Sequence, residues 1–256
     1  MKIFLLTKKG LVVYASLFIM AVCMLFSGGG DISEVTTMPK EKKLPIYCVD
    51  RADEKICALT FDAAWDDSDT DRLISVLEKY DAKATFFVVG DWAEKYFESV
   101  KKFADAGHEI ANHSDTHPHI NTLSEQKILE EIEKCGEKIE RITKKKPTLF
   151  RGPYGEYNNT VIEAAESLGY KTLQWDVDSL DWKELSKEEI SERVLSRVKP
   201  GSVMLFHNGV KNTPDALEII LKKLKDDGFK VVSASDMIYH DNYTIDHTGK
   251  QSSNKN

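Results

Sequence analysis

The chain is poor in cysteine, proline and glycine, and it has no excess of basic residues. Its 256 residues include 4 Cys, 7 Pro and 14 Gly, which excludes a collagen-like or low-complexity chain and a disulfide framework. Lys and Arg number 35 against 42 Asp and Glu, and the net charge of −7 argues against a nucleic-acid partner, because phosphate binding needs a basic surface. The remaining composition, 41% hydrophobic and 30% charged, is that of a globular domain with an ample core.

One apolar segment, near the N-terminus, departs from this composition. Lys2, Lys8 and Lys9 precede the run 10–26, which ends in a serine and three glycines. The run is at the short end of the roughly 17–25 residues that a membrane span needs, and no Ala-x-Ala cleavage triplet follows it. We therefore expect an uncleaved anchor, with 1–9 cytoplasmic, rather than a cleaved signal that leaves a secreted protein. The polar stretch 27–44 is predicted to be a flexible tether outside the cytoplasmic membrane.

From residue 45 to about 241, short β-rich runs alternate with amphipathic helical patterns. The predicted strands are 56–61, 84–89, 109–111, 148–150, 172–175, 203–206 and 229–232. Most of the intervening segments are predicted helices, including 93–106 and 125–144, and capping boxes are expected at Ser186 with Glu189 and at Thr160 with Glu163. About seven β-α repeats without an internal linker predict a single barrel-like α/β domain with parallel strands. The polar end, 242–256, is expected to be frayed.

Three cysteines lie in this domain. Cys48 and Cys57 flank a polar turn, and a hairpin there would place them opposite each other, either bridged or as two unpaired strand residues. Cys135 belongs to the series Ile128, Ile132, Cys135 and Ile139, whose spacing is typical of the buried stripe of a helix.

Chemically versatile side chains follow the predicted strands at their carboxyl ends. They are Asp62, His113, His117, Arg151, Asp178, Asp181 and His207. Because the carboxyl ends of parallel strands in a barrel converge on one face, we expect these side chains to meet in one site. His113 and His117 form an i, i+4 pair that, on one helical turn, would aim both imidazoles at a single metal ion.

Five segments, in this order, resemble the polysaccharide deacetylase family, which is carbohydrate esterase family 4 with its NodB homology domain. They are Thr-Phe-Asp at 60–62, Asn-His-Ser-Asp-Thr-His at 112–117, Arg-Gly-Pro-Tyr-Gly at 151–155, Asp-Ser-Leu-Asp-Trp at 178–182 and Leu-Phe-His at 205–207. The resemblance covers about residues 56–240. It implies a distorted (β/α) barrel with fewer than eight repeats and metal-dependent removal of acetyl groups from N-acetylated sugar polymers.

The resemblance also implies a role for each matched residue. For catalysis these are Asp62 as general base, Arg151 as the residue that holds it, Tyr154 as a backbone N–H donor to the oxyanion, Asp181 as the group that orients His207, and His207 as general acid. The implied metal ligands are His113 and His117, for a divalent ion that we expect to be Zn, with Co, Ni or Mn as alternatives. The implied substrate contacts are Trp182 and Leu205 in the acetyl pocket, with Pro153 and Tyr154.

The sequence departs from the family at one position. The family usually places a second aspartate, a metal ligand, directly after the base, and here that residue is Ala63. Members that look most similar, sporulation-type peptidoglycan deacetylases, have an acidic residue shortly after a tryptophan. We therefore hypothesise that Asp67 supplies the missing oxygen, with Asp66 or a water molecule as the alternatives. The alternative is that both acids begin the next helix and complement its dipole.

These observations predict a membrane-tethered, monomeric, metal-dependent N-deacetylase of cell-wall glycan, with peptidoglycan preferred to chitin. One alternative is a glycan-binding pseudoenzyme that has lost its metal. Another is an esterase or small-amide deacetylase on the same fold. A serine or cysteine nucleophile lacks support, since the sequence has no Gly-x-Ser-x-Gly motif and no cysteine beside the site residues.

Overall fold

The computed structural model describes residues 41–254. None of the helices in this part has both the length and the apolar character needed to cross a membrane. The predicted cytoplasmic end, the anchor at 10–26 and most of the tether lie outside the described residues.

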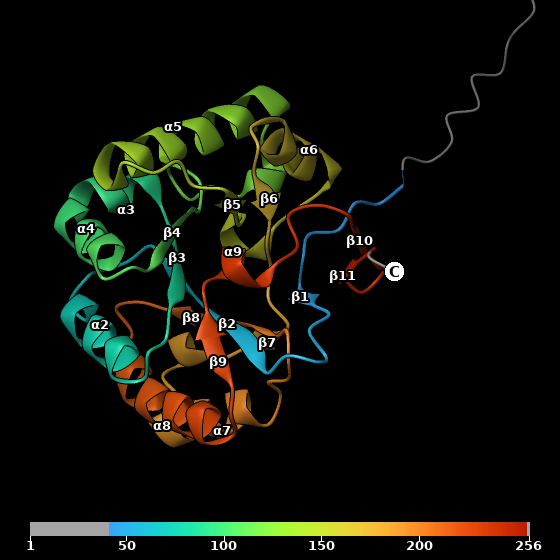
Figure 1. The fold of residues 1–256 in the computed structure, drawn as a ribbon. Helices are drawn as coiled ribbons and strands as arrows, with labels where there is room; N and C mark the ends of the chain where they lie inside the picture. The colour runs from blue at the N-terminus through green and yellow to red at the C-terminus, as the bar shows by residue number, and fades with distance from the viewer. Residues whose placement is uncertain (1–40, 255–256) are drawn as a thin grey trace, which may run out of the picture. The chain divides into compact units, whose positions relative to one another are not determined.

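A parallel sheet that curls into a half-barrel forms the centre of the domain (Figure 1). Its strands run in the order β6-β5-β4-β3-β2-β8-β7, with β9 beside the first half of β2. Their bounds are β2 Ile56–Ala63, β3 Ala84–Val88, β4 Glu109–Asn112, β5 Leu149–Phe150, β6 Lys171–Thr172, β7 Val177–Asp178, β8 Val203–His207 and β9 Lys230–Val232. The α/β class and the curled parallel sheet are as predicted.

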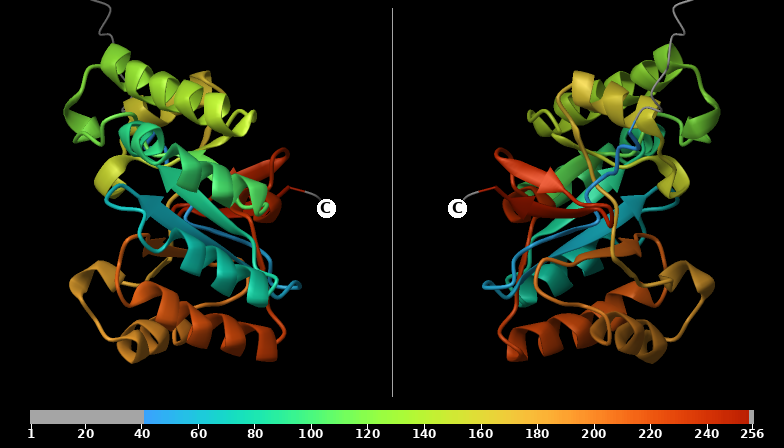
Figure 2. Two further views of the ribbon diagram at one scale, coloured as in Figure 1. Left: turned by 90° about the vertical axis from the view of Figure 1, so that its left-hand side faces the viewer. Right: turned by 90° about the vertical axis from the view of Figure 1, so that its right-hand side faces the viewer.

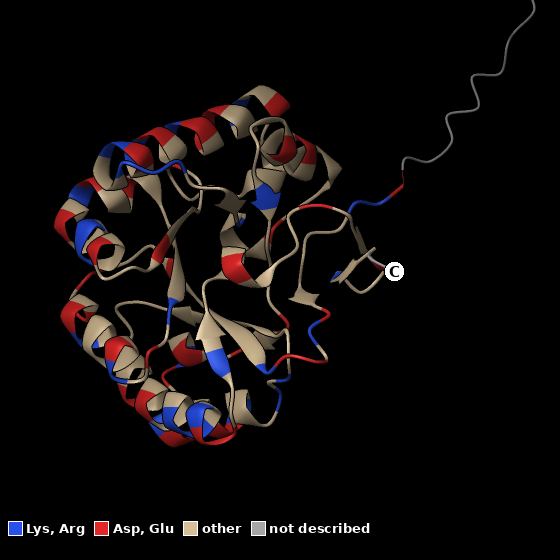
Figure 3. Cartoon of the chain, viewed as in Figure 1, with Lys and Arg blue, Asp and Glu red and all other residues tan. Residues whose placement is uncertain are grey.

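Helices cover the outside of this sheet, as Figures 1 and 2 show. They are α2 Thr70–Lys79, α3 Gly90–Lys95, α4 Phe97–Asp105, α5 Glu125–Thr143, α6 Asn159–Ser167, α7 Lys187–Leu195, α8 Thr213–Asp226 and α9 Ala234–Met237. Lys and Arg alternate with Asp and Glu along them, whereas the strands carry few charges (Figure 3). The core therefore lies between the helices and the sheet.

Side-chain alternation along β2 separates this core from the site. Leu59, Phe61 and Ala63 belong to the cluster under the helices, where the rings of Phe61 and Phe86 stack with centroids 4.7 Å apart. Thr60 and Asp62 therefore point to the opposite, concave face of the sheet. The parallel register of β2 and β8 makes Asp62 and His207 lateral neighbours at the carboxyl ends of their strands.

Several local predictions need correction. The predicted helix 93–106 is interrupted at Tyr96, where α3 ends and α4 begins. The capping box of Ser186 with Glu189 is confirmed, but Asn158 caps α6 in place of the predicted Thr160. The stripe that includes Cys135 is buried in α5 as predicted.

The C-terminal segment is not frayed over 243–253, so that expectation was wrong. Two strands, β10 Tyr243–Ile245 and β11 Lys250–Ser253, form a small sheet with β1, Cys48–Val49. The side chain of Gln251 is fully buried and bonds both the N–H and the carbonyl of Tyr239. Because β1 pairs with β11, the predicted hairpin of Cys48 with Cys57 does not form, and both are free thiols.

Candidate active site

A cavity of about 380 Å³ opens at the carboxyl ends of the central strands. It is lined by Asp62, Ala64, Trp65, His113, His117, Tyr154, Gly155, Trp175, Asp178, Trp182, Leu205 and His207. Arg151 and Asp181, both fully buried, are bonded to Asp62 and His207 respectively. The structure thus brings together the side chains that the sequence placed at separate strand ends.

Arg151 holds the carboxylate of Asp62. Its Nη1 donates to Oδ1 of Asp62 at 2.7 Å, and Nη2 donates to the hydroxyl of Thr60 and to the carbonyl of Gln174. Burial alone would raise the pKa of the Asp62 carboxyl, but the charge of Arg151, with smaller contributions from His113 and His207, holds it below its ordinary value. Asp62 is therefore an ionised, oriented base in a buried position.

His113 and His117 lie beside this carboxylate. Nε2 of His113 is 3.5 Å from Oδ2 of Asp62, and the two imidazole centroids are 5.1 Å apart. The i, i+4 spacing predicted that both lie on one helical turn, but the segment that carries them is not helical. After β4 the chain bends sharply, and Ser114 (φ 66°) and His117 (φ 58°) have left-handed backbone conformations. The turn is held by hydrogen bonds from Ser114 N–H to Asn112 and from His117 N–H to the Ser114 hydroxyl.

Both imidazoles are suited to bind a metal ion. Nδ1 of His113 lies 2.8 Å from the carbonyl of Arg151, which assigns the proton to Nδ1 and leaves the lone pair of Nε2 facing the cavity. Burial lowers the pKa of His113 below its ordinary value, although Asp62 opposes this, and burial lowers the pKa of His117 to about 4. The two rings are therefore neutral near pH 7, as metal ligands must be.

A third protein ligand does not emerge from the structure. Asp67, the predicted third ligand, accepts a hydrogen bond from the Ser99 hydroxyl at 2.7 Å and does not line the cavity in this structure. The carboxylate of Asp66 accepts hydrogen bonds from the backbone N–H and the hydroxyl of Ser68. Ala63, the position where the family has its acid, is buried under the helices. Over residues 41–254 no group of three His, Cys, Asp or Glu side chains is arranged to hold a metal ion.

His207 lies next to Asp62 in the sheet and is tied to Asp181. Nδ1 of His207 lies 2.8 Å from Oδ1 of Asp181, whose Oδ2 accepts from the His207 backbone N–H and from the Thr213 hydroxyl. Burial would lower the pKa of His207, but the hydrogen bond and charge of Asp181 outweigh it, so the pKa is raised. His207 can therefore start charged and present an Nε2 proton to the cavity.

Aromatic side chains form the rim. Trp65, Tyr154 and Trp182 are 55%, 61% and 51% exposed, respectively, although all three are large and apolar. Leu205 also lines the cavity, whereas Pro153 is buried next to Tyr154 in the chain and is not part of the lining. Exposed aromatic rings around one opening are suited to stack on the apolar faces of sugars.

A stack behind Tyr154 was missed from the sequence. The Tyr154 ring contacts His117 edge-on, at a centroid distance of 4.6 Å, and stacks nearly parallel on His119 at 4.4 Å. His119 is fixed in turn by Glu156, whose carboxylate lies 2.7 Å from Nδ1. Tyr154 has φ 58°, a conformation that costs roughly 1–2 kcal/mol for a residue other than glycine. The stack therefore helps to hold a strained loop against a metal-ligand candidate.

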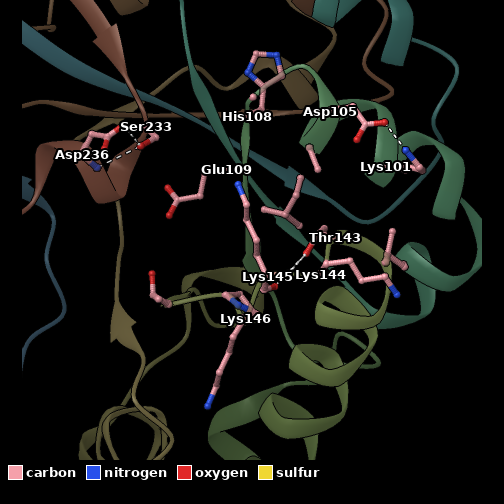
Figure 4. Close-up of a pocket in the computed structure, with 16 residues that line it drawn as sticks. Lys101, Asp105, His108, Glu109, Thr143, Lys144, Lys145, Lys146, Ser233 and Asp236 are labelled. Carbon is pink, nitrogen blue, oxygen red and sulfur yellow. Dashed lines mark hydrogen bonds and ion pairs between the residues drawn. The ribbon is translucent and has the colours of Figure 1, made fainter.

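A second cavity, of about 540 Å³, lies at the amino ends of β4 and β5 and is drawn in Figure 4. Its acids are already engaged: Glu109 bonds Thr85 and Ser235, and Asp105 pairs with Lys101. Asp236 accepts from the Ser233 hydroxyl, and Nδ1 of His108 accepts from the Ala84 N–H. We therefore place the chemistry in the smaller cavity.

Comparison with known proteins identifies the family of the chain. The family model described as polysaccharide deacetylase matches residues 50–173. The chain is 34% identical over 204 residues to peptidoglycan-N-acetylmuramic acid deacetylase PdaC of Bacillus subtilis (strain 168), an alignment that covers 80% of this chain but only 42% of that relative. It is 35% identical over 190 residues to a peptidoglycan-N-acetylglucosamine deacetylase of Bacillus cereus, covering 72% of this chain and 89% of the relative.

A solved structure extends the likeness to the fold. A carbohydrate esterase family 4 pseudoenzyme from Bacillus anthracis aligns with a TM-score of 0.73 and 34% identity, over 76% of this chain and 68% of that one. A mutant of that pseudoenzyme, described as having restored enzymatic activity, aligns equally well. Matches of this identity and coverage show that the chain belongs to the polysaccharide deacetylase family.

Proposed function

We propose that this protein is a metal-dependent N-deacetylase of N-acetylated cell-wall glycan, with peptidoglycan as its substrate. The observation that supports this most is that Asp62 and His207 lie side by side at the ends of two adjacent strands. Arg151 lowers the pKa of Asp62, and Asp181 raises the pKa of His207. Two titratable groups whose pKa values are pushed apart in one cavity are suited to act as base and acid of one reaction.

Amide hydrolysis requires both groups. Ionised Asp62 removes the proton from the attacking water, and Arg151 keeps that carboxylate oriented and charged. Protonated His207 delivers a proton to the departing amine, which otherwise leaves poorly, and Asp181 stabilises the charged imidazole while this happens. His207 and Asp181 are 26 positions apart in the chain, and Asp62 and Arg151 are 89 apart. The fold of the sheet, and not the local sequence, therefore sets the geometry of both pairs.

His113 and His117 would hold a divalent cation, with zinc as our first choice and Co, Ni or Mn as alternatives. Neutral imidazoles fit such an ion, and the Arg151 carbonyl fixes the tautomer of His113. A site with two protein ligands leaves more positions open than the usual three. When bound, the ion would acidify a water molecule and polarise the acetyl carbonyl.

The setting is proposed from the sequence. An anchor at 10–26 and a tether at 27–44 would keep the domain outside the cytoplasmic membrane and close to the wall, where we propose that it acts as a monomer. A glycan-binding pseudoenzyme is the second candidate, because the donor set stops at two imidazoles and a structural neighbour is a pseudoenzyme.

One experiment separates the two candidates. The full chain, purified in detergent, is assayed for acetate release from peptidoglycan and from N-acetylglucosamine oligosaccharides, with and without a chelator and with added zinc. We expect zinc-dependent acetate release that is lost in Asp62→Asn and in His113→Ala and is retained in the control Asp67→Asn. Binding of glycan without any acetate release, with zinc supplied, would favour the pseudoenzyme.

A further inference from the structure

The turn that carries His113 and His117 has a strained backbone. Ser114 and His117 have φ values of 66° and 58°, and a left-handed conformation costs roughly 1–2 kcal/mol for a residue other than glycine. Strain of this kind persists only where the surrounding structure fixes it. The contacts that fix this turn therefore decide how accurately the two imidazoles are aimed at one point.

The carboxylate of Glu131, in α5, holds the middle of this turn. Its Oε2 accepts the backbone N–H groups of Asp115 at 3.0 Å and of Thr116 at 2.8 Å, and its Oε1 accepts the Thr116 hydroxyl at 2.9 Å. Within residues 41–254 no backbone carbonyl accepts either N–H group. Hydrogen bonds to an ionised acceptor are about twice as strong as neutral ones, so one side chain fixes two peptide groups between the two histidines.

Other contacts join the same turn to α5 and to the start of α3. Nζ of Lys138 lies 2.7 Å from Oδ1 of Asp115, and the amide of Asn112 donates to the Ile132 carbonyl in α5 at 2.7 Å. Two backbone N–H groups at the start of α3 donate to carbonyls of the turn, each at 2.9 Å. None of the described residues of α5 lines the cavity, so the helix acts on the site only through this turn.

The two imidazoles differ in how they are held. Nδ1 of His113 lies 2.8 Å from the Arg151 carbonyl, which fixes that ring directly. The His117 ring instead contacts the rings of His113 and Tyr154, so its position depends on the backbone of the turn. Groups that are ordered before binding lose less conformational entropy when the ligand arrives. Two imidazoles that bind one ion therefore gain affinity if the turn is rigid beforehand.

We propose that Glu131 is a positioning residue for the metal ion. It holds the N–H groups of Asp115 and Thr116, and in this way it sets the direction from which His117 reaches the ion. This inference rests on the proposed metal-dependent function, because it requires both imidazoles to bind the ion. A purely structural Glu131 would contribute to the stability of the domain and leave the zinc affinity of the folded protein unchanged.

The test is calorimetric titration of zinc into the full chain in detergent, after removal of metal with a chelator. Glu131→Asp keeps the charge on a side chain that is one methylene shorter, and Glu131→Ala removes the carboxylate. Both break the contact and should weaken zinc binding by about tenfold, a typical loss when a group behind a metal ligand is changed. Either variant is sufficient if the other does not fold.

Two variants serve as controls. Glu131→Gln keeps the length and one acceptor oxygen without the charge, and its zinc affinity should stay within about threefold of the wild type. Glu133→Gln removes an exposed carboxylate from the same helix and should leave the affinity unchanged. Thermal unfolding in the presence of chelator shows which variants are folded at the temperature of the titration.

Hydrogen exchange of the metal-free protein reports the turn itself. The amide hydrogens of Asp115 and Thr116 should exchange about tenfold faster in Glu131→Asp than in the wild type, because their acceptor is lost. In Glu133→Gln their exchange should not change. This measurement needs neither zinc nor substrate, so it is independent of the activity of the enzyme.

The possible failures are distinguishable. Wild-type zinc affinity in a folded Glu131→Asp or Glu131→Ala variant would overturn the inference, while the metal-dependent function stands. A loss in Glu131→Gln as large as in Glu131→Asp would assign the effect to the charge of Glu131 instead of its contacts, and would also overturn it. Absence of zinc binding by the wild type would overturn the proposed metal dependence, and the inference with it.

Discussion

Replacing Arg151 by methionine should destabilise the domain strongly, and more at high pH than at low pH. The guanidinium is fully buried, bonded to Asp62 at 2.7 Å, and stacked over the rings of Phe87 and Trp175 at 4.0 and 5.3 Å. Methionine fills a comparable volume, so the main loss is the partner of a buried carboxylate. Removal of one member of such a pair costs about 3–5 kcal/mol.

The pH dependence follows from Asp62. In the wild type its folded pKa lies below the unfolded value, so its contribution to stability is present above the unfolded pKa and is lost as pH falls through the folded pKa. Without Arg151, burial is no longer offset and raises the folded pKa above the unfolded one. The ionised carboxylate then destabilises the variant at high pH, and protonation relieves this penalty as the pH falls.

The assay is chemical and thermal unfolding of the full chain in detergent at about pH 5 and about pH 8. A loss of 3–5 kcal/mol should lower Tm by about 6–20 °C for a domain of this size. The double variant Asp62→Asn with Arg151→Met removes the orphaned charge and should recover part of that loss. A loss below about 1 kcal/mol, or a double variant no more stable than Arg151→Met at the higher pH, would refute this reasoning.

Three further changes test other parts of the site. Asp181→Asn removes the charge that raises the pKa of His207, so the alkaline limit of kcat/KM should move to lower pH, and an unmoved profile would count against His207 as the acid. His119→Ala should lower kcat by about tenfold and weaken zinc binding in calorimetric titrations. His119→Phe keeps a ring against Tyr154 and should retain most of the activity and of the zinc affinity. Equal losses in the two variants would argue against a role for the stacked ring. Asp67→Asn should leave the zinc content unchanged, and a tenfold weaker affinity would restore Asp67 as a ligand.

The sequence predicted those parts of the fold whose signal is local. β2 and β8 are apolar runs long enough to recognise, and their strand ends carry Asp62 and His207. β7 is two residues long and exists because it pairs with β8, and β11 is a polar strand whose partner β1 lies about two hundred positions earlier. Neither pairing leaves a local periodic signal, so both were missed.

The same distinction applies within the site. Residue type and strand position were sufficient to predict that Asp62, His113 and His207 lie close together. The direction of a side chain was not predictable from the sequence, and the carboxylate of Asp67 points to Ser99. The stack of His119 on Tyr154 depends on two loops that meet only in the folded chain. A second histidine just after the metal-ligand candidate His117 was the one available signal.

The buried charges also weigh against a purely binding role. A glycan-binding module needs the exposed rings of the rim, but it needs neither Asp62 paired with Arg151 nor Asp181 paired with His207. Such pairs contribute little net stability, and apolar residues of similar volume in their place are often neutral or stabilising by 1–4 kcal/mol. Here both pairs point charge into one cavity from neighbouring strands, with opposite effects on the pKa values of the two groups that face each other. That arrangement has a physical use in proton transfer and none in stacking sugars, and the alanine at position 63 leaves these acid–base pairs in place.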